Sequence, residues 1–317
     1  MPELIDACMD GDGSPPSCTV VIATRDRPEY LSRCLDAVTK QSYPAFDVLV
    51  VDNGSSGDAT LQTAQQWGVR HVSEPVAGLS RARNRGARES DKEIVAYLDD
   101  DAVPQPGWLE ALGREFRDQR VIAVTGRVIP LEESDSSAGT GVVLGTCQRQ
   151  TRVVLDRDNP HWFEWANFGG VGIGANMAMR RSAFATWPGF DTRLGRGAAI
   201  SGGEENYAFF ALVERGYRLV YTPDAIVRHR TAKTSEESYT AHLRSLAIIS
   251  AYVIFLFAEH PQYRARLLRY VLGGVRGSTR AWRERHAATE PAAAPRWRQA
   301  IAWMSGPWLY ARSRLIA

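Results

Sequence analysis

Apolar residues in the first half of the chain alternate between continuous runs and stripes of helical spacing. The runs at 18–24 and 46–52 are apolar and β-branched almost throughout, as expected of strands buried on both faces of a parallel sheet. Between them, apolar residues recur on one helical face behind Pro28, at a position where a helix tolerates its missing N–H. The alternation continues with helices expected up to Trp67 and at 78–90 and 108–117, and with strands at 69–72 and 94–99. This order predicts an α/β fold with a mostly parallel, doubly wound sheet that binds ligands at the carboxyl ends of its strands.

The pattern is less regular after residue 120. A strand is expected at 121–129, followed by a loop-rich stretch at 132–170. Further elements are expected at 174–180, 182–187 and 205–215, with two short strands at 218–221 and 225–229. Beyond this point strand alternation stops and the chain becomes helical and rich in Arg. The sequence therefore divides into a flexible leader (1–17), an α/β domain (18–235) and a helical extension (236–317).

Charge is distributed unevenly along the chain. The net charge is only +2, which argues against a nucleic-acid partner. From Pro261 onward, however, eleven Arg face only Glu284 and Glu290, a net charge of +9. A basic tail of this kind predicts attraction to phosphate groups, including those of a lipid surface.

The cysteine and apolar patterns indicate a cytoplasmic setting, with peripheral contact at the inner membrane face as a further option. The four Cys show neither zinc nor disulfide spacing, and Cys18 and Cys34 lie within apolar patterns typical of a core. The segment 1–17 has no apolar centre and is not a signal peptide. The run 246–258 is thirteen residues long, which predicts that it is too short to span a bilayer. We expect it to pack on the domain or on a second subunit of a homodimer, rather than to rest on a membrane surface.

Acidic residues gather where two predicted strands end. Asp52 closes one strand, and Asp99, Asp100 and Asp101 close another. Three adjacent carboxylates repel one another unless a cation lies among them, and such oxygen ligands suit Mg²⁺ or Mn²⁺. A solvated acidic turn is the alternative.

Seven motifs occur in an order that resembles family 2 glycosyltransferases. They are the segments 20–28 (VVIATRDRP), 50–56 (VVDNGSS), 78–86 (GLSRARNRG), 97–102 (YLDDDA), 174–184 (GANMAMRRSAF), 202–205 (GGEE) and 227–229 (VRH). The resemblance covers about residues 18–230. It implies the GT-A nucleotide-diphospho-sugar transferase fold, with a nucleotide-binding half (18–130) and an acceptor-binding half (131–235).

The resemblance implies donor contacts at the ends of the first strands. Thr24 and Arg25 match positions that contact the nucleotide. Asp52 matches the carboxylate that accepts the imide N–H of uracil or thymine, although it could instead cap the turn that follows. Arg81 and Arg83 could reach the base and diphosphate; residues two apart on a helix do not share a face, and Arg83 matches the family better.

The same resemblance assigns the acidic triplet. Asp99 and Asp100 would contact the nucleotide-sugar, with Asp99 on the ribose side. Asp101 would bind Mn²⁺ or Mg²⁺. His229 matches a histidine that approaches the metal or the diphosphate, which requires a neutral imidazole.

The catalytic base is expected within Glu204-Glu205, at the start of a helix. A carboxylate there would take the acceptor proton on the face opposite the departing diphosphate, so transfer inverts the anomeric carbon. The family usually has Glu-Asp, with Asp as the base. Position therefore favours Glu205, while Glu204 could be the base or could orient it.

The acceptor side is the least specified part of the sequence. Asn176 and Trp187 lie where the family builds this side, and so does the aromatic cluster 162–165, although aromatic residues also pack in cores. The expected reaction moves one sugar at a time from a UDP- or dTDP-sugar to a hydroxyl on a glycan, lipid-linked sugar or small molecule. The alternatives are a sugar nucleotidyltransferase, disfavoured because no Gly-rich loop follows the first strand, and a binding module that has lost catalysis.

Overall fold

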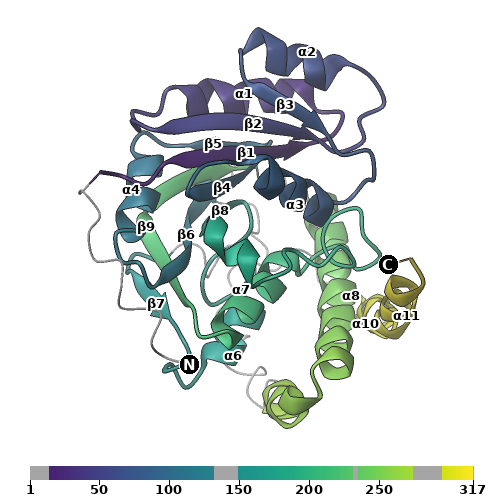
Figure 1. Cartoon of the computed structure of the whole chain (residues 1–317). Coiled ribbons are helices and arrows are strands. Elements are labelled where there is room, and N and C mark those ends of the chain that lie inside the picture. Colours follow the sequence, from purple (N-terminus) through teal and green to yellow (C-terminus); the bar gives the residue numbers. More distant parts are fainter. Residues whose placement is uncertain (1–13, 132–148, 231–234, 274–294, 317) are drawn as a thin grey trace.

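The computed structural model describes residues 14–131, 149–230, 235–273 and 295–316. These residues form one nine-stranded sheet with helices on both faces, and a group of helices beside it (Figure 1). Residues 1–13 of the expected leader (1–17) and residues 132–148 of the expected loop-rich stretch (132–170) lie outside the described residues.

The first four strands form the parallel part of the sheet that the sequence predicts. They are β1 (Cys18–Thr24), β2 (Phe46–Asp52), β3 (Arg70–Ser73) and β4 (Ile94–Asp99), in the order β3-β2-β1-β4. Their register places Thr24 beside Asp52 and Ala23 beside Asp99, so these carboxyl ends meet at one edge. The crossover helices are α1 (Pro28–Thr39), α2 (Ala59–Gln66) and α3 (Leu79–Glu89).

The second half of the sheet is mixed. It contains β5 (Ala102–Pro104), β6 (Val121–Pro130), β7 (Val153–Leu155), β8 (Asn176–Arg180) and β9 (Arg218–His229). β8 is antiparallel to β4 and β6, whereas β6 and β9 are parallel. The two short strands expected at 218–221 and 225–229 are one strand, because a register shift opposite Gly126 and Arg127 accommodates the interruption at 223–225. β9 then continues antiparallel to β5, with His229 beside Ala102.

Two hydrophobic cores lie on the two faces of the sheet. One packs α1 and α4 (Trp108–Glu115), and it contains the buried free thiols of Cys18 and Cys34 as predicted. The other packs α3, α6 (Trp162–Asn167), α7 (Glu204–Glu214) and part of α8 (Ser235–Glu259). The aromatic cluster at 162–165 belongs to this core, where the Trp162 ring stacks on Phe210. The 182–187 segment forms a short 3-10 helix, η2 (Arg181–Ala185).

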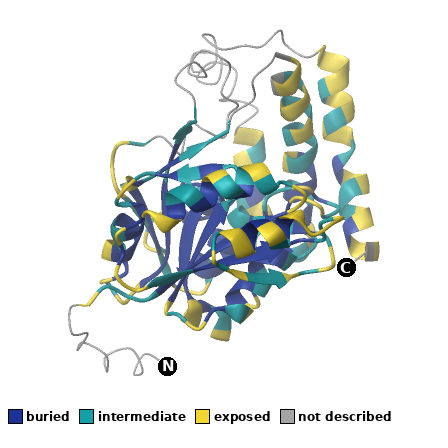
Figure 2. Cartoon of the chain, turned by 90° about the horizontal axis from the view of Figure 1, so that it is seen from above, coloured by how far each residue is buried: buried dark blue, intermediate teal, exposed yellow. Residues whose placement is uncertain are grey.

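The helical extension continues the core rather than standing apart from it. Ala251, Tyr252, Phe255 and Leu256 of α8 are buried against the sheet domain, which is the packing the sequence favoured. After η3 (Pro261–Tyr263) the residues 264–273 are helical. α10 (Arg296–Met304) and α11 (Gly306–Ile316) pack along α8 (Figures 1 and 2).

The length expected for the apolar part of α8 was wrong. The helix includes flanking residues beyond 246–258, and Tyr239–Glu259 is long and apolar enough to cross a membrane by length and composition. Within its most apolar window, 28% of the residues are buried inside the protein. The apolar segment is longer than the run 246–258 because the helix also includes residues 239–245 and 259.

Both residues expected on the acceptor side are structural. Asn176 is completely buried, and its side-chain oxygen accepts a hydrogen bond from Trp108 Nε1 at 2.8 Å. Its amide donates to the carbonyl oxygens of Arg127 at 3.0 Å and Ala225 at 2.8 Å, which joins β8 to β6 and β9. Trp187 is buried against Phe190 in the core. Neither side chain can contact an acceptor, because both are buried in the protein.

Replacing the buried amide tests this structural role. Asn176→Ala leaves the Trp108 N–H and two carbonyl oxygens without partners, so we expect the free energy of unfolding to fall by about 3 kcal/mol. Gln119→Ala, at an exposed position, is the control and should change it by less than about 0.5 kcal/mol. Chemical denaturation measures both values. An unchanged midpoint for Asn176→Ala, combined with weaker acceptor binding, would reverse the assignment.

Candidate active site

A cleft of about 230 Å³ opens at the carboxyl ends of β1 and β4, beside the start of α3. Its walls carry both basic and acidic groups. The lining residues include Thr24, Arg25, Arg27, Asn53, Gly78, Asp99, Asp100, Asp101, Arg196 and Gly197. The cleft therefore lies at the sheet edge where the sequence predicted ligand binding.

The loop after β1 is held by the loop after β2. Asp26 has a left-handed backbone with φ of 51°, an uncommon conformation for a residue other than Gly. Its carboxylate accepts hydrogen bonds from the Ser56 N–H at 2.7 Å and the Ser56 hydroxyl at 2.9 Å, and its own N–H donates to Ser55 Oγ. These bonds fix the turn that presents Arg25 and Arg27 to the cleft.

Asp100 is turned inward and held by two partners. The Thr24 hydroxyl donates to Asp100 Oδ2 at 2.7 Å, and Arg27 donates to Oδ1 at 3.2 Å. Burial raises the pKa of Asp100 to about 6, although the bond from Thr24 opposes the change. Thr24 and Asp100 were both expected to contact the nucleotide-sugar. In the structure the Thr24 hydroxyl and Asp100 Oδ2 are hydrogen-bonded to each other.

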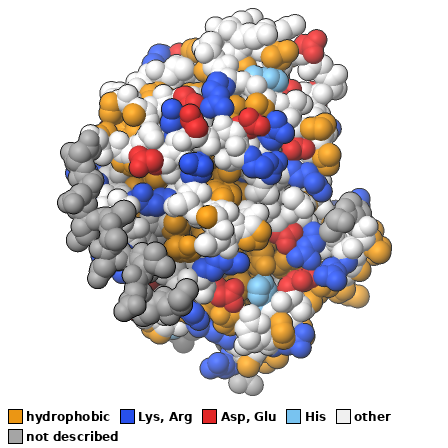
Figure 3. All heavy atoms as spheres, in the orientation of Figure 1, with side chains coloured by type: hydrophobic (Ala, Val, Ile, Leu, Met, Phe, Trp, Pro, Cys, Tyr) orange, Lys and Arg blue, Asp and Glu red, His pale blue; other side chains and the backbone are white. Residues whose placement is uncertain are grey.

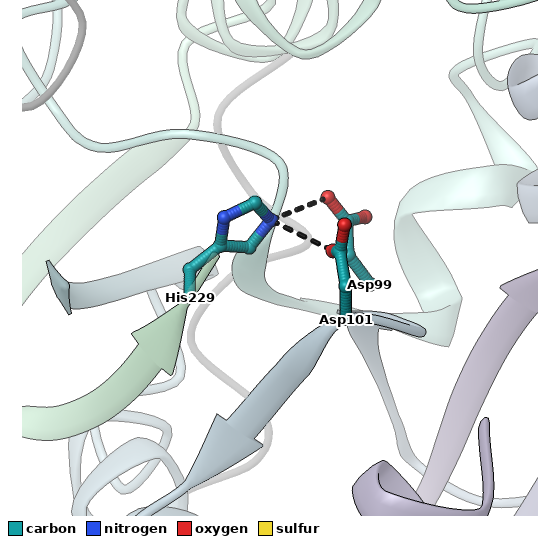
Figure 4. Close-up of side chains that lie close together, drawn as sticks. All are labelled: Asp99, Asp101 and His229. Carbon is teal, nitrogen blue, oxygen red and sulfur yellow. Dashed lines mark ion pairs between the residues drawn. The ribbon is translucent and has the colours of Figure 1, made fainter. Parts of the chain in front are cut away.

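Asp99, Asp101 and His229 form a cluster of metal-ligating groups (Figure 4). His229 Nε2 lies 3.0 Å from Asp101 Oδ1 and 3.6 Å from Asp99 Oδ2, and one ligand atom from each residue lies within 4.8 Å of the others. Sequence analysis paired Asp101 with His229 but placed Asp99 on the ribose side. The structure brings all three together, because β9 pairs with β5 directly after the acidic triplet.

The donor set suits a divalent cation. Two carboxylates and one imidazole match Mn²⁺ well, and Mg²⁺ through the carboxylates. His229 Nδ1 lies 2.8 Å from the Arg230 carbonyl oxygen, so a neutral ring donates there and leaves Nε2 free to ligate. Burial would lower the pKa of His229, but its contacts with Asp101 and Asp99 outweigh burial and raise the pKa to about 10. A cation would therefore have to displace a proton from this ring.

Arg83 lies behind the cleft rather than in it. Its side chain is 3% exposed, with Nη1 2.9 Å from Glu204 Oε1 and Nη2 3.4 Å from Asp99 Oδ1. Nη2 also donates to the Gly174 carbonyl oxygen at 3.0 Å. The expectation that Arg83 reaches the base and diphosphate was wrong, since the helix turns this side chain into the protein. Arg81, the alternative, is not among the residues that line the cleft.

The two adjacent glutamates have different environments. Glu204 is buried and committed to Arg83. Glu205 is half-buried, and burial together with the charge of Glu204 raises its pKa to about 8, against the opposing charge of Arg83. Both follow Gly203, whose φ of 83° favours Gly and whose missing side chain leaves room for Tyr252.

Asp52 forms the turn that the sequence offered as an alternative. Its Oδ1 accepts a hydrogen bond from the Ser55 N–H at 3.0 Å, and its Oδ2 lies 3.8 Å from His71 Nε2. Asp52 itself does not line the cleft, whereas the adjacent Asn53 does.

Sequence reasoning missed two arginines of the cleft, Arg27 and Arg196. Arg196 lies between Gly195 and Gly197, which have φ of 100° and 88°. Its carbonyl oxygen accepts the Leu79 N–H at 2.9 Å, and a side chain at Gly197 would come within 3.2 Å of the Gly78 backbone. The Gly-Arg-Gly sequence was the available signal, because two glycines around one Arg often mark a loop with special backbone geometry.

An ion-pair network ties this loop to the helical extension. Arg193 pairs with Asp191 at 2.7 Å and with Glu259 of α8 at 2.9 Å. Glu259 also accepts a hydrogen bond from Tyr310 and pairs with Arg314, both of α11, at 3.0 Å each. The position of the loop that carries Arg196 therefore depends on α8 and α11.

Comparison with known proteins finds several glycosyltransferases among the relatives. Glycosyltransferase AglE of Haloferax volcanii is 38% identical over 103 residues, covering 30% of this chain and 34% of that protein. The glucosyl-dolichyl phosphate glucuronosyltransferase of the same organism is 24% identical, covering 67% and 68%. The pre-mycofactocin glycosyltransferase of Mycobacterium tuberculosis is 28% identical, covering 67% and 42%. The chain thus spans about a third of the first protein and two fifths of the third.

Solved structures share the fold. A mannosyltransferase of Pyrobaculum calidifontis, in complex with GDP-Man and Mn²⁺, superposes with a TM-score of 0.58 at 18% identity, covering 96% of this chain and 74% of that one. TarS of Staphylococcus aureus, in complex with UDP-GlcNAc, gives 0.55 at 14%, covering 75% and 66%. These likenesses confirm the expected GT-A fold. The model of glycosyl transferase family 2 matches residues 19–187, more than half of the chain, and the chain belongs to that family.

Proposed function

We propose that this protein transfers one sugar at a time from a UDP- or dTDP-sugar to a hydroxyl group, with inversion at the anomeric carbon. The observation that carries the proposal is the cleft itself. It places the cluster of Asp99, Asp101 and His229 and the arginines Arg25, Arg27 and Arg196 at one sheet edge. We further propose that residues 18–130 form most of the donor site, to which Arg196 and His229 are added, that residues 131–235 bind the acceptor and that the protein works in the cytoplasm.

The basic wall of the cleft suits a diphosphate. Arg25 and Arg196 are exposed within it, and guanidinium groups donate paired hydrogen bonds to phosphate oxygens. Asp99, Asp101 and His229 would hold Mn²⁺ or Mg²⁺, which when bound neutralises the negative charge that develops on the leaving diphosphate. The cation in the mannosyltransferase complex with GDP-Man and Mn²⁺ supports this assignment.

Glu205 is the base in this proposal. Glu204 is buried and bonded to Arg83, whereas the pKa of Glu205 is raised to about 8. The raised pKa makes the ionised carboxylate a stronger base, which takes the proton of the acceptor hydroxyl as the oxygen attacks the sugar. Attack on the face opposite the diphosphate gives inversion in a single step.

The nucleobase and the acceptor class are proposed from Asp52 and from the relatives. Asp52 uses Oδ1 in the turn, so in this proposal its Oδ2, which lies 3.8 Å from His71 Nε2, accepts the imide N–H of uracil or thymine. The structural neighbours bind different nucleotides, GDP-Man in one and UDP-GlcNAc in the other, so the base requires a direct test. Among acceptor classes, a lipid-linked sugar has the support of the relative named for glucosyl-dolichyl phosphate.

Thermal-shift measurements test the donor and the metal together. We expect UDP or dTDP to raise the melting temperature only with Mn²⁺ present, and GDP to raise it less, because bound ligand stabilises the folded state. Asp101→Asn should remove the metal-dependent part of the shift. A shift that is equal with a chelator present, or that GDP gives most strongly, contradicts the proposal.

Substituting the cleft arginine tests the diphosphate contact. Arg196→Gln should raise the donor KM about tenfold, because it removes a charged hydrogen-bond donor from the cleft wall. Arg81→Gln is the matched control on α3, outside the cleft lining, and should leave KM unchanged. Initial-rate kinetics at varied donor concentration distinguish them. A raised donor KM in Arg81→Gln and an unchanged KM in Arg196→Gln would instead indicate that α3 contacts the diphosphate.

The two glutamates should respond differently to amide substitution. Glu205→Gln should lower kcat about a thousandfold with the fold intact, whereas Glu204→Gln should lower the free energy of unfolding by about 3 kcal/mol because it removes a partner of buried Arg83. Rates and denaturation curves for both variants measure this. Full activity in Glu205→Gln would remove it as the base.

The pH dependence provides an independent test of Glu205. The base acts when deprotonated, so kcat/KM of the wild type should rise with pH and level off above about 8. The folded protein holds this proton more tightly than the unfolded chain, in which Glu205 already ionises near pH 4.5. The free energy of unfolding of the wild type therefore falls as the pH rises from there to about 8. Glu205→Gln should therefore gain thermal stability relative to the wild type as the pH rises from 5 to 9, and an unchanged difference would contradict the raised pKa.

A further inference from the structure

The C-terminal helices carry an exposed apolar surface that the rest of the described protein lacks. Twelve large hydrophobic side chains are exposed among the described residues; eleven lie between residues 249 and 315, and only Val76 lies elsewhere. The most exposed are Leu315 at 87% and Met304 at 75%. A contiguous exposed apolar surface is typical of an interaction site.

The spacing of these residues places them on one side of each helix. Trp297, Ile301 and Met304 are four and three residues apart in α10, and Trp308 and Leu315 are seven apart in α11. Each spacing returns to the same helical face. We call these five side chains the outer face. Figure 3 shows hydrophobic and basic side chains together on this lobe, at the right-hand edge of the view.

The side of α11 that faces α8 is already occupied, beginning at its junction with α10. Gly306 packs against Ser250 of α8, where a larger side chain would clash, and Ser250 Oγ donates to the Trp303 carbonyl oxygen at 2.7 Å. Ser313 is fully buried. The helices are therefore fixed to α8, and the outer face is the side left for a partner.

The segment that carries the outer face has charged side chains of one sign. Residues 291–317 contain Arg296, Arg298, Arg312 and Arg314 and no Asp or Glu. The Arg298 guanidinium lies 5.1 Å from the Trp297 ring centre, and that of Arg312 lies 5.5 Å from Trp308. Trp beside Arg is the combination found where a helix lies in the headgroup region of an anionic membrane, with rings in the interface and guanidinium groups on phosphates.

We propose that the outer face binds the surface of an anionic phospholipid bilayer, with α10 and α11 lying in the plane of the interface. A second copy of the chain fits less well, since two such faces would bring arginines against arginines. A membrane-spanning α8 fits less well too, because Tyr252 and Phe255 would have to leave the core, where the Tyr252 hydroxyl donates to Asn167 at 2.7 Å. The proposal does not rest on the reaction proposed above.

Vesicle flotation of the full chain tests the proposal. Vesicles of phosphatidylcholine with about 30% phosphatidylglycerol are compared with vesicles of phosphatidylcholine alone. We expect the protein to float with the anionic vesicles, to bind the neutral ones at least about tenfold more weakly, and to be released by high salt or alkaline carbonate.

Variants locate the contact. Trp297→Ser combined with Trp308→Ser should lower the partition coefficient about tenfold on both vesicle types. Arg296→Gln combined with Arg312→Gln should lower binding about tenfold on anionic vesicles only. Val76→Ser, which removes the exposed apolar side chain of the sheet domain, is the control and should bind like the wild type. Thermal shifts with UDP and Mn²⁺ should be unchanged in all three, which separates this proposal from that for the active site.

Three outcomes would overturn the proposal. The first is a wild type that does not float with anionic vesicles. The second is a protein that the Trp substitutions do not release, or that stays in the membrane after alkaline carbonate, which would indicate insertion of α8. The third is a dimer in sedimentation that the Trp substitutions dissociate without any vesicle binding, which would make the outer face a contact between copies.

Discussion

The buried guanidinium of Arg83 is the interaction on which the site depends. It joins the end of β4, through Asp99, to the start of α7, through Glu204. Because a buried cation needs carboxylate partners, the two acidic groups are held at fixed positions on either side of it. Gly174 leaves the room that this requires, since a side chain there would lie 2.7 Å from Arg83 Nη2. Glu204 is thereby committed to Arg83, which distinguishes it from the adjacent Glu205.

The metal-ligating cluster depends on a strand pairing distant in sequence. His229 is 128 residues from Asp101, and the antiparallel pairing of β9 with β5 brings it within 3.0 Å. The acidic triplet supplies negative charge, and burial alone would disfavour it. Interaction with His229 offsets that penalty, in the place where we propose that a cation binds. The same atoms thus stabilise the fold and form the donor site.

The helical extension has an inner and an outer role. Its inner side supports the active-site loop, because Glu259 of α8 links Arg193 of the loop to Arg314 of α11. Its outer side carries the exposed Trp and Arg residues. A contact of α11 with a membrane would therefore be connected, through the ion pairs of Glu259, to the loop that carries Arg196. This arrangement would allow a fixed orientation of the cleft toward an acceptor held in a lipid surface.

The parallel half of the sheet and the acids at its edge could be predicted before folding was considered, because continuous apolar runs and helical stripes are local signals that burial preserves. The sequence could not decide which groups of the motifs face the ligand. Asn176, Trp187 and Arg83 lie in motifs or positions of the family yet are buried, while Arg196 had only two glycines to mark it. It also could not separate Glu204 from Glu205, since adjacent residues with the same side chain differ only in what packs around them. Burial, strand pairing and long-range ion pairs decided these points, and they exist only once the chain has folded.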